Sequence, residues 1–318
     1  MMKQVWILLS VTTGFLFATD IEGEYTGSQH WTTSGSPYQI IANASFTSGS
    51  NLEIDPGVEI EFTGDFTLSI GGILDAEGTA TDSITFSSSS STRQGTLSLA
   101  VTSTTLFSSL SYCSFEKMSV GIDLNNDFEP THCSFDDCGT GVNLDNGGTI
   151  SESLMENCDQ GIYGTSSGNI VNCTITNSGR ATDTNGKGIY LKDFDYTIDG
   201  CVVNDNRSYG IYVGDNYSGL GTLEIMDSHV FNNGDLGTYD GLRVNVTNSS
   251  INAYYNSTVN ITNSEFRTNT GSGISVTGAS GYSSRTHIVN SNISGSSIEG
   301  NGGDGLFMGS YSKLMSFE

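Results

Sequence analysis

Charged side chains gather in one stretch of a chain that is otherwise poor in cations: Lys187, Lys192, Asp193 and Asp195, followed one repeat later by Asp205 and Arg207. Removal of a proton next to a sugar carboxylate needs this mixture, because a base must take the proton while cations neutralise the carboxylate. A solvated turn of a repeat would carry the same residue types. The six residues are therefore candidate catalytic residues, with a solvated turn face as the alternative.

Three tyrosines, Tyr163, Tyr190 and Tyr212, each follow an apolar residue in a short strand-like segment. Because side chains alternate across a strand, an apolar residue that points inward places its neighbour on the outer surface. Exposed aromatic rings combine apolar area with a polar tip and suit the faces of sugars. We expect the three tyrosines to bind a ligand, the alternative being that they only cover neighbouring segments.

The segments that carry these residues belong to a repeat. A Gly-apolar-x-apolar unit recurs, with its glycines at Gly121, Gly141, Gly188, Gly210, Gly241, Gly273 and Gly305 and a defective copy at Gly161. A second strand precedes each unit and begins with Cys or Ser, at Cys113, Cys133, Ser153, Cys173, Cys201, Ser228, Ser264 and Ser291. Turn residues such as Asn, Asp and Gly separate the strands.

A unit of about 20 residues with two or three short strands predicts a parallel β-solenoid, an all-β fold. The spacing does not fit a propeller blade, which needs about 40 residues, and leucine is too sparse for a leucine-rich repeat. In a solenoid each coil stacks on the last at about 4.8 Å, so a residue meets its own counterpart one coil away.

The segment before these repeats is more specific. Leu52–Phe62 (LEIDPGVEIEF), Leu68–Thr79 (LSIGGILDAEGT) and Asp82–Phe86 (DSITF) resemble the opening coils of secreted proteins of the pectate-lyase-like superfamily. The resemblance implies a right-handed parallel β-helix over about residues 51–309. It does not imply one activity, because that superfamily contains lyases, hydrolases, epimerases and non-catalytic surface proteins.

The motifs of those enzymes are absent from this chain. It contains no Arg-x-Pro-x-x-Arg run, no Gly-His-Gly or Arg-Ile-Lys segment and no Asp-Pro-His. The resemblance therefore favours the non-catalytic surface-protein type, and catalysis stays the less favoured interpretation.

The six cysteines fall into the repeat register. Neighbouring coils would align Cys113 with Cys133, Cys138 with Cys158, and Cys173 with Cys201, and the coil spacing suits a disulfide. We expect these three disulfides in an exported chain. The alternative is a reduced ladder of thiols packed in the core, since Cys also packs as a small apolar residue.

The ends of the chain suggest three parts. Lys3 and the apolar run Val5–Phe17 have the pattern of a signal peptide, predicted for residues 1–19. Residues 20–50 are expected to form an N-terminal segment or cap, and residues 51–318 the β-helix. We expect no C-terminal cap, which suggests that the chain is a fragment of a longer protein and that the same polypeptide carries further domains.

The composition limits the partners. The chain has 11 Lys and Arg against 35 Asp and Glu, a formal charge of −24. Nucleic-acid binding and docking on anionic membranes both need clustered cations and are excluded. We predict no cofactor; Ca²⁺ is left open, because carboxylates suit it but no Gly-x-Gly-x-Asp array occurs. Nine Asn-x-Ser/Thr sequons, one of them at Asn206, are attributed to turn chemistry or to glycosylation.

Together these patterns predict a scaffold, secreted or at the cell surface, that binds carbohydrate or other surface ligands without catalysis and does not insert into a membrane after signal removal. The first alternative is a polysaccharide lyase or glycoside hydrolase that acts on acidic polysaccharide. The second is a segment of a larger adhesin, because an uncapped last coil leaves an open strand edge.

Overall fold

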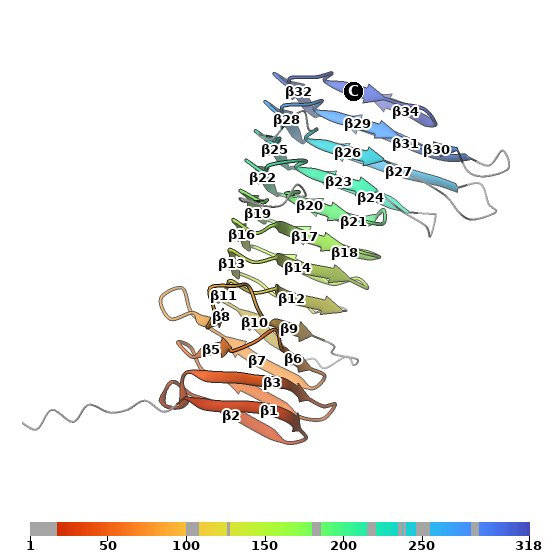
Figure 1. The fold of residues 1–318 in the computed structure, drawn as a ribbon. Coiled ribbons are helices and arrows are strands. Elements are labelled where there is room, and N and C mark those ends of the chain that lie inside the picture. The colour runs from red at the N-terminus through yellow and green to blue at the C-terminus, as the bar shows by residue number, and fades with distance from the viewer. Residues whose placement is uncertain are drawn as a thin grey trace, which may run out of the picture.

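In the computed structural model the chain winds into a rod of stacked coils (Figure 1). The structure describes residues 18–99, 108–125, 128–179, 186–214, 221–234, 237, 240–245, 255–280 and 286–318. Strands of successive coils pair in parallel, which confirms the predicted all-β parallel β-helix. Within the described residues the one helical element is a 3-10 turn, η1 (Thr33–Gly35). None of them forms a helix long and apolar enough to cross a membrane.

Most coils contribute a strand to each of three faces, and one coil contributes only an isolated bridge at Thr131 to the third. The first face contains β5 (Glu59–Phe62), β8 (Ile84–Ser88), β11 (Cys113–Glu116), β13 (Ser134–Asp136), β16 (Leu154–Glu156), β19 (Thr174–Thr176), β22 (Val202–Asn204), β25 (His229–Phe231), β28 (Glu265–Arg267) and β32 (Ser297–Glu299). The second face contains β6 (Thr67–Ile70), β9 (Thr96–Leu99), β12 (Val120–Asn125), β14 (Thr140–Asp145), β17 (Gln160–Gly164), β20 (Ile189–Leu191), β23 (Ile211–Gly214), β26 (Leu242–Asn245), β29 (Ile274–Thr277) and β33 (Leu306–Met308).

The third face closes the coil. It contains β2 (Ser28–Trp31), β4 (Asn51–Ile54), β7 (Ile73–Glu77), β10 (Ser109–Ser111), β15 (Thr149–Ser151), β18 (Ser167–Val171), β21 (Asp195–Asp199), β24 (Thr222–Met226), β27 (Tyr255–Thr262), β31 (Thr286–Ser294) and β34 (Ser312–Phe317). The short β30 (Ala279–Ser280) pairs antiparallel with β31.

The N-terminal strands start the stack. β3 (Tyr38–Phe46) spans two faces, because its first part pairs with β5 and its last part with β6. β1 (Thr19–Tyr25) pairs in parallel with β3. The segment expected to form a cap, residues 20–50, thus contains strands in parallel register with the coils that follow, while most of the predicted signal peptide, residues 1–17, lies outside the described part.

The core is a set of columns that run along the rod. Phe86, Phe115 and Phe135 stack from coil to coil with ring centroids 4.8 Å apart at both steps. All three rings are fully buried. The spacing agrees with the expected distance between stacked coils, and offset-stacked rings add attraction beyond the area they bury.

The glycine of the repeat is needed because backbones approach closely at the start of each second-face strand. A Cβ added at Gly141 would lie 2.6 Å from the carbonyl oxygen of Gly161, and one at Gly210 would lie 2.8 Å from that of Gly241. No side chain fits such a contact. The column of glycines thus follows from the stacking of one coil on the next.

One repeat assignment was wrong. The sequence pattern placed Ser291 in the first-face series, but Ser291 lies in β31 on the third face, opposite Val259 of β27. The residue that follows Ser264 in the series is Ser296, whose hydroxyl accepts a hydrogen bond from the Ser264 amide at 3.1 Å. A Ser-x-Ile sequence occurs on both faces of this coil, so the pattern alone could not separate them.

Candidate functional site

Three tyrosines occupy one outward position on adjacent coils of the second face. Tyr163 of β17 is in register with Tyr190 of β20, which is in register with Tyr212 of β23. The residues beside them, such as Ile189 and Leu191, are fully buried. Ring centroids lie 5.4 Å apart at both steps, with interplanar angles of 63° and 73°. These half-buried side chains, the tyrosine ladder, thus pack edge to face.

Two lysines lie over the tyrosine ladder. Lys187, just before β20, places its Nζ 4.6 Å from the centroid of Tyr190 and 5.3 Å from that of Tyr212. Lys192, just after β20, places its Nζ 5.3 Å from the centroid of Tyr163. An ammonium group at these distances is attracted by the ring face. The ladder is therefore a mixed aromatic and cationic surface.

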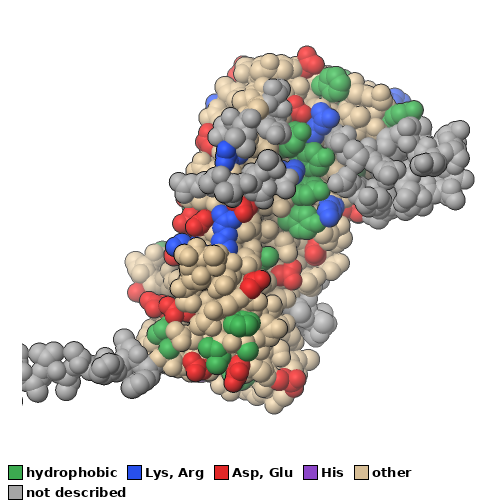
Figure 2. All heavy atoms as spheres, viewed as in Figure 1, with side chains coloured by type: hydrophobic (Ala, Val, Ile, Leu, Met, Phe, Trp, Pro, Cys, Tyr) green, Lys and Arg blue, Asp and Glu red, His purple; other side chains and the backbone are tan. Residues whose placement is uncertain are grey.

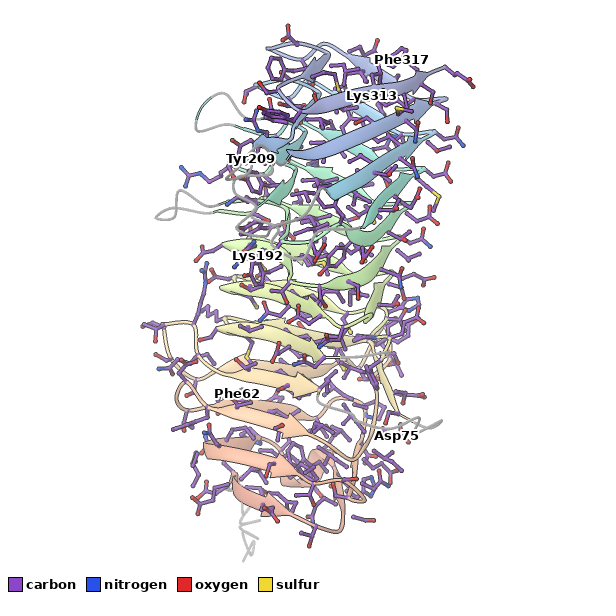
Figure 3. All side chains as sticks on the ribbon, turned by 90° about the vertical axis from the view of Figure 1, so that its right-hand side faces the viewer. Phe62, Asp75, Lys192, Tyr209, Lys313 and Phe317 are labelled. Carbon is purple, nitrogen blue, oxygen red and sulfur yellow. The ribbon has the colours of Figure 1, made fainter. Side chains whose placement is uncertain are left out.

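The same surface continues toward the C-terminus. Tyr209 lies 5.0 Å from Tyr212 between ring centroids, and Arg243 takes the outward position of the next coil, in register with Tyr212. The Arg243 guanidinium donates to the Ser275 hydroxyl at 2.8 Å and lies 3.3 Å from a carboxylate oxygen of Asp240. Figure 3 shows Tyr209 and Lys192 toward the same edge of the rod.

The character of this outward column changes along the rod. Before the tyrosine ladder it holds the polar residues Ser98, Asp123 and Asn143, which pair in register. Partial burial raises the pKa of the Asp123 carboxyl, while hydrogen bonds from Asn143 and Ser98 oppose the rise. The coils that carry the ladder are therefore the ones that offer aromatic rings at this position.

The candidate catalytic residues lie on different parts of the coil. Lys187 and Lys192 contact the tyrosine ladder. Asp193 is buried, and its Oδ1 accepts a hydrogen bond from the Phe194 amide at 2.7 Å. Asp195 begins β21 on the third face, where it accepts from the amide of Thr222.

The other two candidates lie in the turn that follows β22. Asp205 is exposed and has a positive φ of 54°. Arg207 donates from Nη1 to the carbonyl oxygen of Gly179 at 3.0 Å. The structure thus brings the two lysines onto the tyrosine surface and distributes the carboxylates over a turn, a buried position and another face.

The six cysteines are buried free thiols in the structure, in the coil register expected from the repeat. Each thiol lies near backbone carbonyls; the Sγ of Cys138, for example, is 3.5 Å from the carbonyl oxygen of Phe115. Burial raises the pKa of the Cys173 thiol to about 12 and that of Cys201 to about 11. Such thiols are poor nucleophiles at neutral pH, and the three disulfides stay a prediction.

The sequence analysis missed an asparagine ladder formed by the buried Asn206, Asn233 and Asn269 and the half-buried Asn301. The Nδ2 of each Asn donates a hydrogen bond to the Oδ1 of the Asn one coil later, at 2.9 to 3.0 Å. Each Nδ2 also donates to a backbone carbonyl of the preceding coil, as Asn233 does to Val203 at 3.1 Å. An Asn four residues before the repeat glycine, at Asn206, Asn269 and Asn301, was the available signal. Burial in the ladder leaves the Asn206 side chain no room for a glycan.

Comparison with known proteins gives one family match. A family model described as "Right handed beta helix region" matches residues 74–249 and 160–316. The handedness predicted from the sequence is the one that this model describes. No curated protein matches the chain.

Several solved structures are similar at low identity. The periplasmic alginate epimerase AlgG is 12% identical with a TM-score of 0.47, over 94% of this chain and 76% of that one. The A-module of the Azotobacter vinelandii mannuronan C-5 epimerase AlgE6 is 12% identical with a TM-score of 0.39, over 95% and 91%. Pectate lyase Pel9A is 13% identical with a TM-score of 0.37, over 96% and 80%. These likenesses concern the course of the backbone alone.

Proposed function

The chain belongs to the right-handed β-helix family, and from this premise we propose that it binds carbohydrate chains on the second face without catalysis. The tyrosine ladder carries the proposal. Three rings repeat at 5.4 Å on a rigid sheet, so an extended polymer can contact several of them without any change of backbone. Preorganisation of this kind lowers the entropy lost on binding.

The lysines favour an anionic sugar polymer. In a chain of net charge −24, most of the surface repels a polyanion. Lys187 and Lys192 supply positive charge directly over the rings, so the carboxylates of a uronate polymer gain contacts there that a neutral polymer lacks. The expected location is secreted or at the cell surface, in line with the signal-peptide pattern of residues 1–19.

Affinity electrophoresis in gels that contain polygalacturonate, alginate or neutral dextran tests the proposal. We expect the uronate polymers to retard the protein more than dextran does. The double variant Tyr190→Ala/Tyr212→Ala is expected to lose this retardation. Tyr112→Ala is the matched control, because Tyr112 is also half-buried but stacks on His132, 4.6 Å away, outside the second face. Equal mobility in every gel, or equal loss in both variants, would contradict carbohydrate binding.

A second candidate function is cleavage or epimerisation of an acidic polysaccharide. The observation that favours it is the position of two lysines over adjacent tyrosine rings, since one amine can act as base while the other neutralises the sugar carboxylate. Incubation of the protein with the same uronate polymers, followed by the absorbance of unsaturated products and by NMR of the sugar C5 configuration, tests it. Product formation that Lys187→Met abolishes would favour an enzyme over a binding scaffold.

A further inference from the structure

A histidine and two carboxylates meet at the N-terminal end of the third face. His30 of β2 is in register with Glu53 of β4. Asp55 follows two residues after Glu53, and the residues between and before them, Ile54 and Leu52, are buried. Because side chains alternate along a strand, both carboxylates point outward on the side where His30 lies.

The three side chains are close enough to share one ion. The His30 Nε2 lies 2.8 Å from an oxygen of Asp55 and 3.8 Å from an oxygen of Glu53. One ligand atom from each residue lies within 4.8 Å of the others. The side chains are 48%, 52% and 39% exposed for His30, Glu53 and Asp55, so an ion can reach them from solvent.

We propose that His30, Glu53 and Asp55 bind a divalent transition-metal ion, with Zn²⁺ as the test ion. One imidazole nitrogen and two carboxylate oxygens form a ligand set that Zn²⁺ accepts, at about 2.0–2.2 Å from each atom. Small rotations of the side chains, which displace the His30–Asp55 hydrogen bond, bring the three atoms to such distances. Water completes the coordination.

The charge of this region is a second, independent observation. Residues 18–92 contain eleven Asp and Glu and not one Lys or Arg. Another carboxylate, Asp75, lies in register with Glu53 on the next coil. A cation therefore meets attraction from the whole N-terminal end of the rod, and no neighbouring basic side chain of that segment competes for the ligands.

The other histidine pairs of the described surface lack one of these features. His132 contacts one carboxylate, that of Glu152, at 2.6 Å. His229 contacts Glu265, whose carboxylate is also paired with Arg267 at 3.0 Å. Three ligand side chains meet at His30, and fewer meet at His132 and at His229. The His132 and His229 pairs therefore serve as internal controls for metal binding.

Isothermal titration calorimetry of the full chain with ZnCl₂ tests the proposal. We expect one tight site per chain above the weak binding of scattered carboxylates. Outer partners of metal ligands already contribute about 10–100-fold in affinity, so loss of a direct ligand in His30→Ala should weaken the tight phase by about 100-fold. Glu53→Gln, which keeps the shape of the side chain, should weaken it in the same direction.

His132→Ala is the control and should keep the tight phase. In His30→Ala the affinity of the tight phase must fall by about 100-fold while the circular dichroism of the variant without metal matches the wild type. Co²⁺ offers a second readout, because its visible absorption bands report the ligand set directly. A tight phase that survives in both His30→Ala and Glu53→Gln, a tight phase lost equally in His132→Ala, or the absence of any tight phase in the wild type would overturn the assignment.

Discussion

Two regions of one rod carry the same number of carboxylates but differ in their content of Lys and Arg. Residues 18–92 and residues 161–275 each contain eleven Asp and Glu, but the first region has no Lys or Arg and the second has six. Figure 2 shows Asp and Glu along the whole visible face, whereas Lys and Arg lie only on its middle and upper coils. Because the backbone repeats, the difference lies in the outward residues, and from these we propose a cation site in the first region and binding of an anionic polymer in the second.

The largest effect is expected from a substitution that weakens the core packing between the two regions. Phe115 lies in the aromatic stack between them and is fully buried. We expect Phe115→Ala to lower the free energy of unfolding by about 3–5 kcal/mol, measured by urea denaturation. Phe307→Ala is the control, because Phe307 is 41% exposed, and its expected change is below about 0.5 kcal/mol. Equal losses in both variants would contradict the role of the stack.

A smaller effect is expected from a methyl group placed in the second region. In Gly210→Ala the new Cβ meets the Gly241 carbonyl oxygen at 2.8 Å, and overpacking of this kind costs about 1–3 kcal/mol. Gly27→Ala in the first region is the matched control, since nothing lies within 4 Å of its Cβ position. Thermal melts of both variants measure the difference, and a lower melting temperature for Gly27→Ala than for Gly210→Ala would refute the close-approach argument.

Reversal of the two ladder charges makes the second region resemble the first. Lys187→Glu/Lys192→Glu removes the three cation–π contacts, which are worth about 0.5–1 kcal/mol each at exposed sites. We expect retardation by uronate polymers to be lost, with a small change in melting temperature. Wild-type retardation should also fall as salt rises, because screening weakens exposed charge pairs. Retardation that is insensitive to both changes would show that the lysines do not contact the polymer.

The smallest effect concerns the histidine of the second region. A hydrogen bond from His229, with a further one from Arg267, lowers the pKa of the Glu265 carboxyl. Its stabilising contribution is therefore present above the ordinary pKa of Glu and is lost as pH falls through the lowered value. The difference in melting temperature between wild type and Glu265→Gln should shrink over that acidic range. A difference that grows instead would mean that the pairing does not stabilise the fold.

The fold was predictable because the repeats encode it. A parallel stack brings each residue against its counterpart one coil away, so the glycines of the second face and the Cys or Ser column of the first appear in the sequence as periodic positions. The error at Ser291 arose where long connections separate the later units and two faces share one pattern. Asn206 looked like a glycosylation signal because a sequon does not reveal burial.

The candidate site was predictable in part. Strand alternation placed Tyr163, Tyr190 and Tyr212 on one face, and the lysines that flank Tyr190 came with them. Asp193 and Asp195 are close to Lys192 in sequence, but the chain leaves the second face after Lys192. Asp193 is therefore buried in the turn, and Asp195 lies on the third face. No repeat motif contains His30 and Glu53, so the sequence did not predict that they lie side by side. Their contact depends on the register of β2 against β4.

The asparagine ladder also determines how the rod responds to force. Hydrogen bonds between coils run along the long axis, and each coil contacts only its neighbours. A force that pulls the two ends of the chain apart therefore unwinds coils one at a time, breaking the hydrogen bonds of one coil boundary before those of the next. Asn206, Asn233, Asn269 and Asn301 join the later boundaries by one continuous chain of side-chain bonds. Earlier boundaries are crossed instead by separate, exposed side-chain bonds, such as those from Asn146 to Asn125 and from Asn157 to Asp136. Under tension the rod would therefore open first in its earlier coils and keep the later ones wound as an anchor.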